Sequence, residues 1–143
     1  MTYGLDSNVL IDVMKNDETA REVRRRSESV QVAEIVWAET RDRLEQDPEF
    51  DREPDREEVY RKLDAEFVPF PQGADKEAEE MYDQGLHSPD NEILANYVNA
   101  GASGVMTRDG EMLETARKND LDTEHIPAPE DLNARRIEGM FRR

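Results

Sequence analysis

Four acidic residues that lie far apart in the sequence stand where predicted strands end or predicted helices begin. They are Asp6, Glu39, Asp90 and Asp109. Carboxylate oxygens are hard ligands that suit Mg²⁺ or Mn²⁺. Carboxylates packed into a few ångströms repel one another strongly without a cation, and a bound cation lowers the pKa of its water to give a nucleophile at neutral pH. If the fold brings these acids together, the expected chemistry is metal-assisted hydrolysis.

Each acid also has a purely structural explanation. Aspartate is a favoured helix N-cap, which alone accounts for Asp6 and Asp109. Asp90 can complement the positive end of its helix dipole, and Glu39 can be one more solvated acid in an acidic chain. Taken singly, the structural explanation is favoured for every one of them.

Strand-like and helix-like segments alternate along the chain. Strands are predicted at residues 1–6, 30–33, 67–70, 103–107 and 123–126, with helices beginning near residues 9, 17, 35, 55, 74, 89 and 109. Ser88 and Pro89 predict an N-cap followed by proline at the first helical position. Alternation of this kind predicts an α/β fold, a three-layer α/β/α sandwich with a central parallel sheet.

In such folds ligands bind at the carboxyl ends of the strands. Asp6 ends the first predicted strand, and Asp109 follows the strand at residues 103–107. If these two strands are neighbours, their carboxylates converge at one edge. Glu39 lies in the first turns of the helix after the second strand, and Asp90 in the first turn of the helix before the 103–107 strand. The four acids can therefore share one site.

Four short motifs occur in an order and spacing that resemble those of PIN domains. Residues 5–12 (LDSNVLID) resemble the opening motif, and residues 35–39 (IVWAE) resemble the second, in which an apolar run precedes a glutamate. Residues 90–95 (DNEILA) are similar to the third, and residues 105–109 (VMTRD) to the fourth. The resemblance spans residues 3 to 113, and it points to the toxin-type PIN ribonucleases.

The resemblance implies roles for particular residues. The acidic metal ligands would be Asp6, Glu39, Asp90 and Asp109. The supporting residues would be Ser7 and Thr107, whose hydroxyls orient ligands or water, and Asn8, which stabilises the loop beneath the site. The implied cofactor is Mg²⁺ or Mn²⁺ and the implied substrate is RNA. Because many members are toxins, the resemblance also implies an antitoxin partner and a homodimer.

Some residues depart from the family pattern or add to it. Glu34 stands where a small hydroxyl residue is more usual, and Glu92 is a candidate extra ligand beside Asp90. Arg108 is the candidate contact to an RNA phosphate. Residues 46–58 are dominated by charge and proline, which predicts a loop or a mobile flap of unassigned role.

Composition bounds the class of protein. A chain of 143 residues fits a single domain (1–143), with residues 127–143 predicted as a loosely ordered tail. The absence of cysteine excludes a disulfide framework, a thiolate zinc site and a cysteine nucleophile. No apolar stretch reaches the length of a membrane span, so a cytoplasmic protein is expected.

The formal net charge of −16 is the most unusual feature of the composition. Such a surface repels nucleic acid at ordinary salt. High acid content with few lysines resembles the proteins of salt-loving microbes, and in molar salt the Debye length is only about 3 Å. A halophilic source is therefore expected, and bulk charge does not exclude an RNA partner.

Three other functions remain open from the sequence. The first is a non-catalytic PIN-like module that binds RNA or protein. The second is a phosphatase with an aspartate nucleophile after the first strand, but such enzymes often carry a second aspartate two residues on, where this chain has Asn8. The third is a nuclease that uses the same four acids on DNA.

Overall fold

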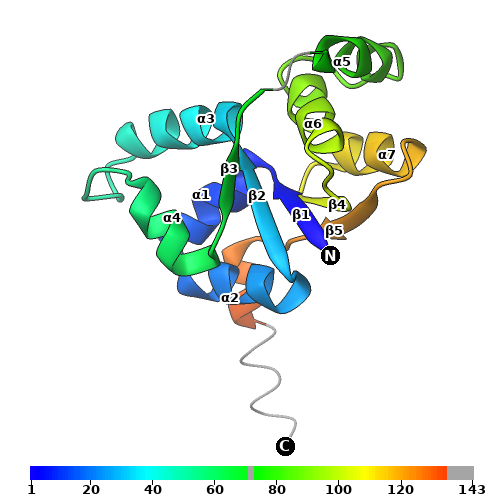
Figure 1. The fold of residues 1–143 in the computed structure, drawn as a ribbon. Coiled ribbons are helices and arrows are strands. Elements are labelled where there is room, and N and C mark those ends of the chain that lie inside the picture. The colour runs from blue at the N-terminus through cyan, green and yellow to red at the C-terminus, as the bar shows by residue number, and fades with distance from the viewer. Residues whose placement is uncertain (71–72, 135–143) are drawn as a thin grey trace, which may run out of the picture.

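A parallel sheet forms the centre of the molecule. The computed structural model describes residues 1–70 and 73–134. Its strands are β1 (Thr2–Leu5), β2 (Ser29–Ala33), β3 (Glu66–Val68), β4 (Gly104–Thr107) and β5 (Asp122–His125). They pair in the order β3-β2-β1-β4-β5, and every pairing is parallel (Figure 1). The predicted parallel sheet is therefore confirmed.

Helices cover the sheet in two groups. The first group is α1 (Ser7–Lys15), α2 (Asp17–Arg26), α3 (Glu34–Glu45) and α4 (Arg56–Leu63), and α1 packs against each of the other three. The second group is α5 (Ala74–Asp83), α6 (Asp90–Asn99) and α7 (Gly110–Lys118), in which α6 contacts both neighbours. Figure 1 shows the two groups on the two sides of the sheet. The three-layer α/β/α sandwich predicted from the sequence is confirmed.

β1 is the middle strand of the sheet, and its carboxyl end leads directly to Asp6. It pairs with β2 on one side and with β4 on the other, and Leu5 is the register partner of Met106. Leu5 and Met106 are fully buried, as expected for a parallel strand covered on both faces. The residue after β1, Asp6, therefore lies beside the residue that ends β4, Thr107.

Tyr97 on α6 holds the ends of β1 and β2 together. Its hydroxyl donates to the carbonyl oxygen of Leu5 and accepts a hydrogen bond from the Ala33 amide over 3.1 Å. The ring packs directly on Gly4, where any added Cβ would collide with it. The small residue in β1 is thus required by the close approach of the Tyr97 ring.

The start of α6 differs from the prediction. Ser88 is not the N-cap: the helix begins at Asp90, Pro89 occupies the cap position, and no side chain caps it. The reason is that backbone carbonyls satisfy the first amides instead. Asn91 donates to the carbonyl oxygen of His87 over 3.2 Å, and Ile93 donates to that of Pro89 over 3.0 Å.

The sequence predicts a loop or mobile flap over residues 46–58 and a helix that begins near Asp55, and in the structure the last three of these residues belong to α4. That helix begins at Arg56 because the Asp55 carboxylate caps it, accepting from the Glu57 amide over 3.0 Å. The remaining segment is fastened to α1. Lys15 pairs with Asp47 over 2.6 Å, and Arg52 donates to the carbonyl oxygen of Met14 over 2.9 Å.

Two further predictions concern the chain ends and membranes. Within the predicted tail at 127–143, residues 129–134 are helical and residues 135–143 lie outside the described part, so the loosely ordered tail stays a prediction. No helix among the described residues has both the length and the apolar character that crossing a membrane requires.

Candidate functional site

Asp6 is the most buried of the four candidate acids and lies at the carboxyl end of β1. Only 4% of its surface is exposed. It is the N-cap of α1, and its Oδ1 accepts from the Ser7 amide over 2.8 Å. Its Oδ2 accepts from the Thr107 hydroxyl over 2.7 Å and from Asn8 Nδ2 over 3.3 Å. Asp6 therefore caps α1 with one carboxylate oxygen, while Thr107 and Asn8 orient the other.

Burial raises the pKa of the Asp6 carboxyl above its ordinary value. The hydrogen bonds from Thr107 and from the Ser7 amide oppose that shift, whereas the negative charges of Glu39 and Asp109 add to it. Glu39 and Asp109 are more than 30 and more than 100 positions from Asp6 in the sequence, yet the charges of both raise the pKa of the Asp6 carboxyl.

Asp109 reaches the same place from β4. The Thr107 hydroxyl that donates to Asp6 also accepts from the Asp109 amide over 3.0 Å. Asp109 is the N-cap of α7, and its Oδ1 accepts from the Glu111 amide over 2.9 Å. Because β1 and β4 are neighbours, Asp6 and Asp109 converge at one edge of the sheet, as the sequence predicted.

Glu39 is placed by α3, the helix that follows β2. Its Oε1 accepts a hydrogen bond from the Ser7 hydroxyl over 2.8 Å. Because Ser7 follows Asp6 directly in the chain, this bond holds Glu39 beside the end of β1. The same oxygen lies 3.1 Å from Nη2 of Arg43, one turn further along the helix. Glu39 is therefore held between a hydroxyl on the inner side and an exposed guanidinium on the outer side.

Asp90, the first residue of α6, carries the strongest electrostatic signal of the site. Its pKa is raised to about 7 from an ordinary value of 3.8. Burial is the largest cause, followed by the charge of Asp6, a hydrogen bond with Asp109, and the charges of Asp109 and Glu39. Besides its burial, the Asp90 carboxyl therefore feels the negative charges of Asp6, Asp109 and Glu39.

The four acids do not form a closed cage. In the described part of the chain, no three His, Cys, Asp or Glu side chains are arranged closely enough to hold a metal ion. The donor set nevertheless suits a hard cation, because Mg²⁺ keeps several waters and is usually bound through one or two carboxylates. A bound cation would also offset the repulsion among the neighbouring carboxylates that helps to raise the pKa of Asp90.

Two other predicted site residues are placed differently. Asn8 lies on α1 and donates to Asp6, while its Oδ1 is buried without a partner among the described residues. Glu92 lies two residues after Asp90 on α6. It is not among the main charges that act on Asp90 or Asp6. Glu34 pairs instead with Arg56 over 2.7 Å, away from the acids.

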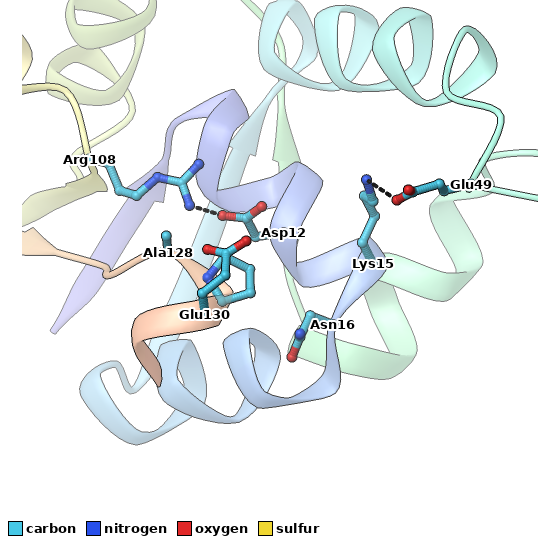
Figure 2. Close-up of a pocket in the computed structure, with 8 residues that line it drawn as sticks. Asp12, Lys15, Asn16, Glu49, Arg108, Ala128 and Glu130 are labelled. Atoms are coloured by element: carbon cyan, nitrogen blue, oxygen red, sulfur yellow. Dashed lines mark hydrogen bonds and ion pairs between the residues drawn. The ribbon is translucent and has the colours of Figure 1, made fainter. Parts of the chain in front are cut away.

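Arg108 faces α1. Its Nη1 donates to Oδ2 of Asp12, and both side chains are largely buried, with 28% and 14% of their surface exposed. A cavity of about 320 Å³ opens beside this ion pair, between α1 and residues 128–130 (Figure 2). Glu130 and Lys15 line it, and in Figure 2 the Lys15 ammonium is directed at Glu49.

Sequence reasoning missed three residues that support the site. Arg43 has a readable signal, since it follows Glu39 by four positions on a helix. Tyr97 carries no signal in the sequence beyond an apolar helix face, whereas in the structure its hydroxyl contacts the ends of two strands. Asp12 was read only as part of a motif, because nothing in the sequence pairs it with Arg108, which lies 96 positions away.

Comparison with protein families gives one match that covers most of the chain. The family described as PIN domain matches residues 3–118. No curated protein matches the sequence significantly. The match includes all four candidate acids and the hydroxyl residues between them.

Solved structures share the fold at low sequence identity. A toxin-antitoxin complex from Klebsiella pneumoniae matches with a TM-score of 0.59 and 17% identity, covering 75% of this chain and 86% of that chain. VapBC2 from Rickettsia felis, bound to a DNA fragment from its promoter, has a TM-score of 0.61 and 18% identity, with coverage of 89% and 100%. PAE2754 from Pyrobaculum aerophilum has a TM-score of 0.57 and 16% identity, with coverage of 86% and 89%.

Proposed function

The chain belongs to the PIN domain family, and on this premise we propose that it is a metal-dependent endoribonuclease that hydrolyses RNA phosphodiester bonds. The metal ligands in this proposal are Asp6, Glu39, Asp90 and Asp109, with Asp6 and Asp109 central. The observation that carries it is the convergence of Asp6 and Asp109 at the ends of the neighbouring strands β1 and β4, where the Thr107 hydroxyl bonds to both residues; the raised pKa of Asp90 supports it.

The proposed cofactor is Mg²⁺ or Mn²⁺. When bound, it would supply a water of lowered pKa as the nucleophile and positive charge at the leaving oxygen. The donor chemistry fits, since all four candidate ligands offer carboxylate oxygens. Asp6 and Asp109 would bind it directly, and Glu39 and Asp90 would do so directly or through water.

The chain's own residues would prepare these ligands. The Thr107 hydroxyl fixes the orientation of Asp6 and of the Asp109 backbone, and the Ser7 hydroxyl does the same for Glu39. Asp90 holds a proton on its carboxyl near neutral pH, and that proton must leave when a cation binds there. Because water rather than the ribose 2′-hydroxyl attacks, the products should carry 5′-phosphate and 3′-hydroxyl ends.

The biological setting is proposed by analogy of fold. Two of the similar structures are described as a toxin-antitoxin complex and as VapBC2 bound to promoter DNA. We infer that this chain is a toxin with an antitoxin partner, acting on cytoplasmic RNA as a homodimer. Sedimentation of the chain alone and mixed with the product of a neighbouring gene tests both associations.

A second candidate is a non-catalytic PIN-like module that binds RNA or protein. It is favoured by one observation, that no three acids in the described residues already form a metal cage. The two candidates differ in the chemistry they allow. The module binds its partner without cutting it, whatever metal is added.

Incubation of the purified protein with a pool of cellular RNAs in high salt separates them. Parallel reactions contain Mg²⁺, Mn²⁺ or a chelator, and the new RNA ends are sequenced. The proposal expects cleavage with either metal, none with chelator, and 5′-phosphate ends on the products. Binding without cleavage supports the module, and cleavage that persists in chelator contradicts the metal mechanism.

A further inference from the structure

The ion pair between Asp12 and Arg108 joins two parts of the chain that both lead to the acids. Asp12 lies in the middle of α1, whose first residue follows Asp6. Arg108 lies between Thr107 and Asp109, in the turn from β4 to α7. The pair is therefore a cross-link between α1 and this turn (Figure 2).

A second link joins the same two parts closer to the acids. The Thr107 hydroxyl donates to Asp6, and it also accepts from the Asp109 amide. The turn is thus held against the start of α1 by Thr107 and against the middle of α1 by Arg108. With both links in place, the Asp109 backbone has little freedom to move relative to Asp6.

Burial makes the outer link more than a surface ion pair. Only 14% of the Asp12 side chain and 28% of the Arg108 side chain are exposed. Exposed ion pairs contribute little to stability, but a largely buried one is costly to break because the remaining charge is left without its partner. The pair therefore has a defined geometry that can orient the residues attached to it.

We propose that Asp12 is a positioning residue: by holding Arg108, it fixes the turn that carries Asp109 at the distance from Asp6 that cation binding requires. This inference rests on the proposed function, because it assumes that the acids bind a divalent cation. Residues that orient metal ligands typically change metal affinity by about 10–100-fold when they are removed. Asp12 itself does not contact the cation in this proposal.

The charges of the two residues make the test decisive. A purely electrostatic effect would have opposite signs: loss of the Asp12 charge would weaken cation binding, and loss of the Arg108 charge would strengthen it. Loss of positioning has the same sign for both. The variants Asp12→Asn and Arg108→Gln should therefore both weaken Mn²⁺ binding by about tenfold, and Arg108→Lys, which keeps the ion pair, should stay near the wild type.

The measurement is calorimetric titration of the metal-free full chain with Mn²⁺, at a temperature where circular dichroism shows every variant folded. The double variant Asp12→Asn/Arg108→Gln should bind no more weakly than either single variant, because one link is lost in all three. A matched control is Glu58→Gln on α4, which breaks the half-buried pair that Glu58 forms with Arg52. It should lower the unfolding temperature without changing Mn²⁺ affinity.

Three results would overturn the inference in distinguishable ways. If the wild type binds Mn²⁺ and Arg108→Gln binds it equally or more tightly, positioning by Asp12 is wrong and the proposed function stands. If the folded wild type binds neither Mn²⁺ nor Mg²⁺, the inference and the proposed metal mechanism fail together. A loss of affinity in Glu58→Gln equal to that in Asp12→Asn would show that the effect is general loosening of α1.

Discussion

The Thr107 hydroxyl donates to Oδ2 of Asp6 over 2.7 Å, although the two residues are 101 positions apart in the sequence. This bond crosses from the end of β4 to the end of β1, the two neighbouring strands at the centre of the sheet. The same hydroxyl accepts from the Asp109 amide. One side chain therefore sets the orientation of two of the proposed ligands.

Replacing Thr107 by valine tests that role, because valine has nearly the same shape and lacks the hydroxyl. Asp6 loses a buried hydrogen bond, so its carboxylate is less well fixed, and RNA cleavage and Mn²⁺ affinity should fall by about tenfold or more. The matched control is Thr19→Val on α2, whose buried hydroxyl has no partner among the described residues. Equal activity of Thr107→Val and wild type would contradict the role assigned to the hydroxyl.

The raised pKa of Asp90 predicts how the metal-free protein responds to pH. Its pKa is 3.8 ordinarily and about 7 in the folded chain, so between these values the folded state binds more protons than the unfolded state. Stability should therefore fall as pH rises from about 4 to 7 and should not recover above that range. Adding a divalent cation should reverse the loss, because it takes the place of the proton.

The variant Asp90→Asn isolates this contribution. In chelator at pH 8 it should unfold about 3 °C above the wild type, corresponding to about 1 kcal/mol after allowance for the partial exposure of Asp90. The difference should vanish near pH 4, where the wild-type carboxyl is protonated. Asp75→Asn, in the first turn of α5, controls for the helix dipole. A wild type more stable than Asp90→Asn in chelator at pH 8 would argue against crowding of the acids.

Gly4 tests the support that α6 gives to β1. In Gly4→Ala the new methyl group collides with the Tyr97 ring, which must then shift away from Leu5 and Ala33. Overpacking of this kind costs about 1–3 kcal/mol, so the urea midpoint should fall clearly. Gly110→Ala, at the first position of α7, meets no atom within 4 Å and should leave the midpoint nearly unchanged. Equal midpoints for the two variants would show that the Tyr97 ring is not tightly held.

The net charge of −16 predicts a strong dependence of stability on salt. In 2 M KCl the Debye length is shorter than the spacing of most surface acids, so their mutual repulsion is screened. The unfolding temperature should rise by several degrees between 0.1 and 2 M KCl, consistent with the proposed halophilic source. Sucrose at matched osmolality controls for solvent exclusion. A lower unfolding temperature in 2 M KCl would mean that the ion pairs matter more than the repulsion.

Alternation of strands and helices was enough to predict the three-layer sandwich, because few arrangements satisfy parallel strands with helical crossovers. The positions of Asp6 and Asp109 followed from it on one condition, that β1 and β4 are neighbours, and the structure supplies that condition. Glu39 and Asp90 lie on helices, where sequence position does not fix which way a side chain reaches. Their placement beside Asp6 needed the packing of α3 and α6.

The start of α6 and the ion pair between Asp12 and Arg108 could not be predicted from the sequence, for other reasons. Ser88 has the side chain of an N-cap, but the backbone of His87 and Pro89 already supplies the acceptors. With 35 acidic and 19 basic residues, composition offers Arg108 many partners, and only the fold selects Asp12. Local pairs such as Glu39 with Arg43 are predictable because the helix period alone brings them together.

The most direct test of the central claim is calorimetric titration of the metal-free protein and its Asp6→Asn variant with Mg²⁺ and Mn²⁺. Asparagine also caps helices well, so the variant should stay folded. The control is Asp55→Asn, which changes the N-cap of α4 away from the acids. We expect the wild type and Asp55→Asn to bind the cation and Asp6→Asn to bind it at least a hundredfold more weakly and to lose RNA cleavage. Undiminished cation binding or full cleavage activity in Asp6→Asn would contradict the account.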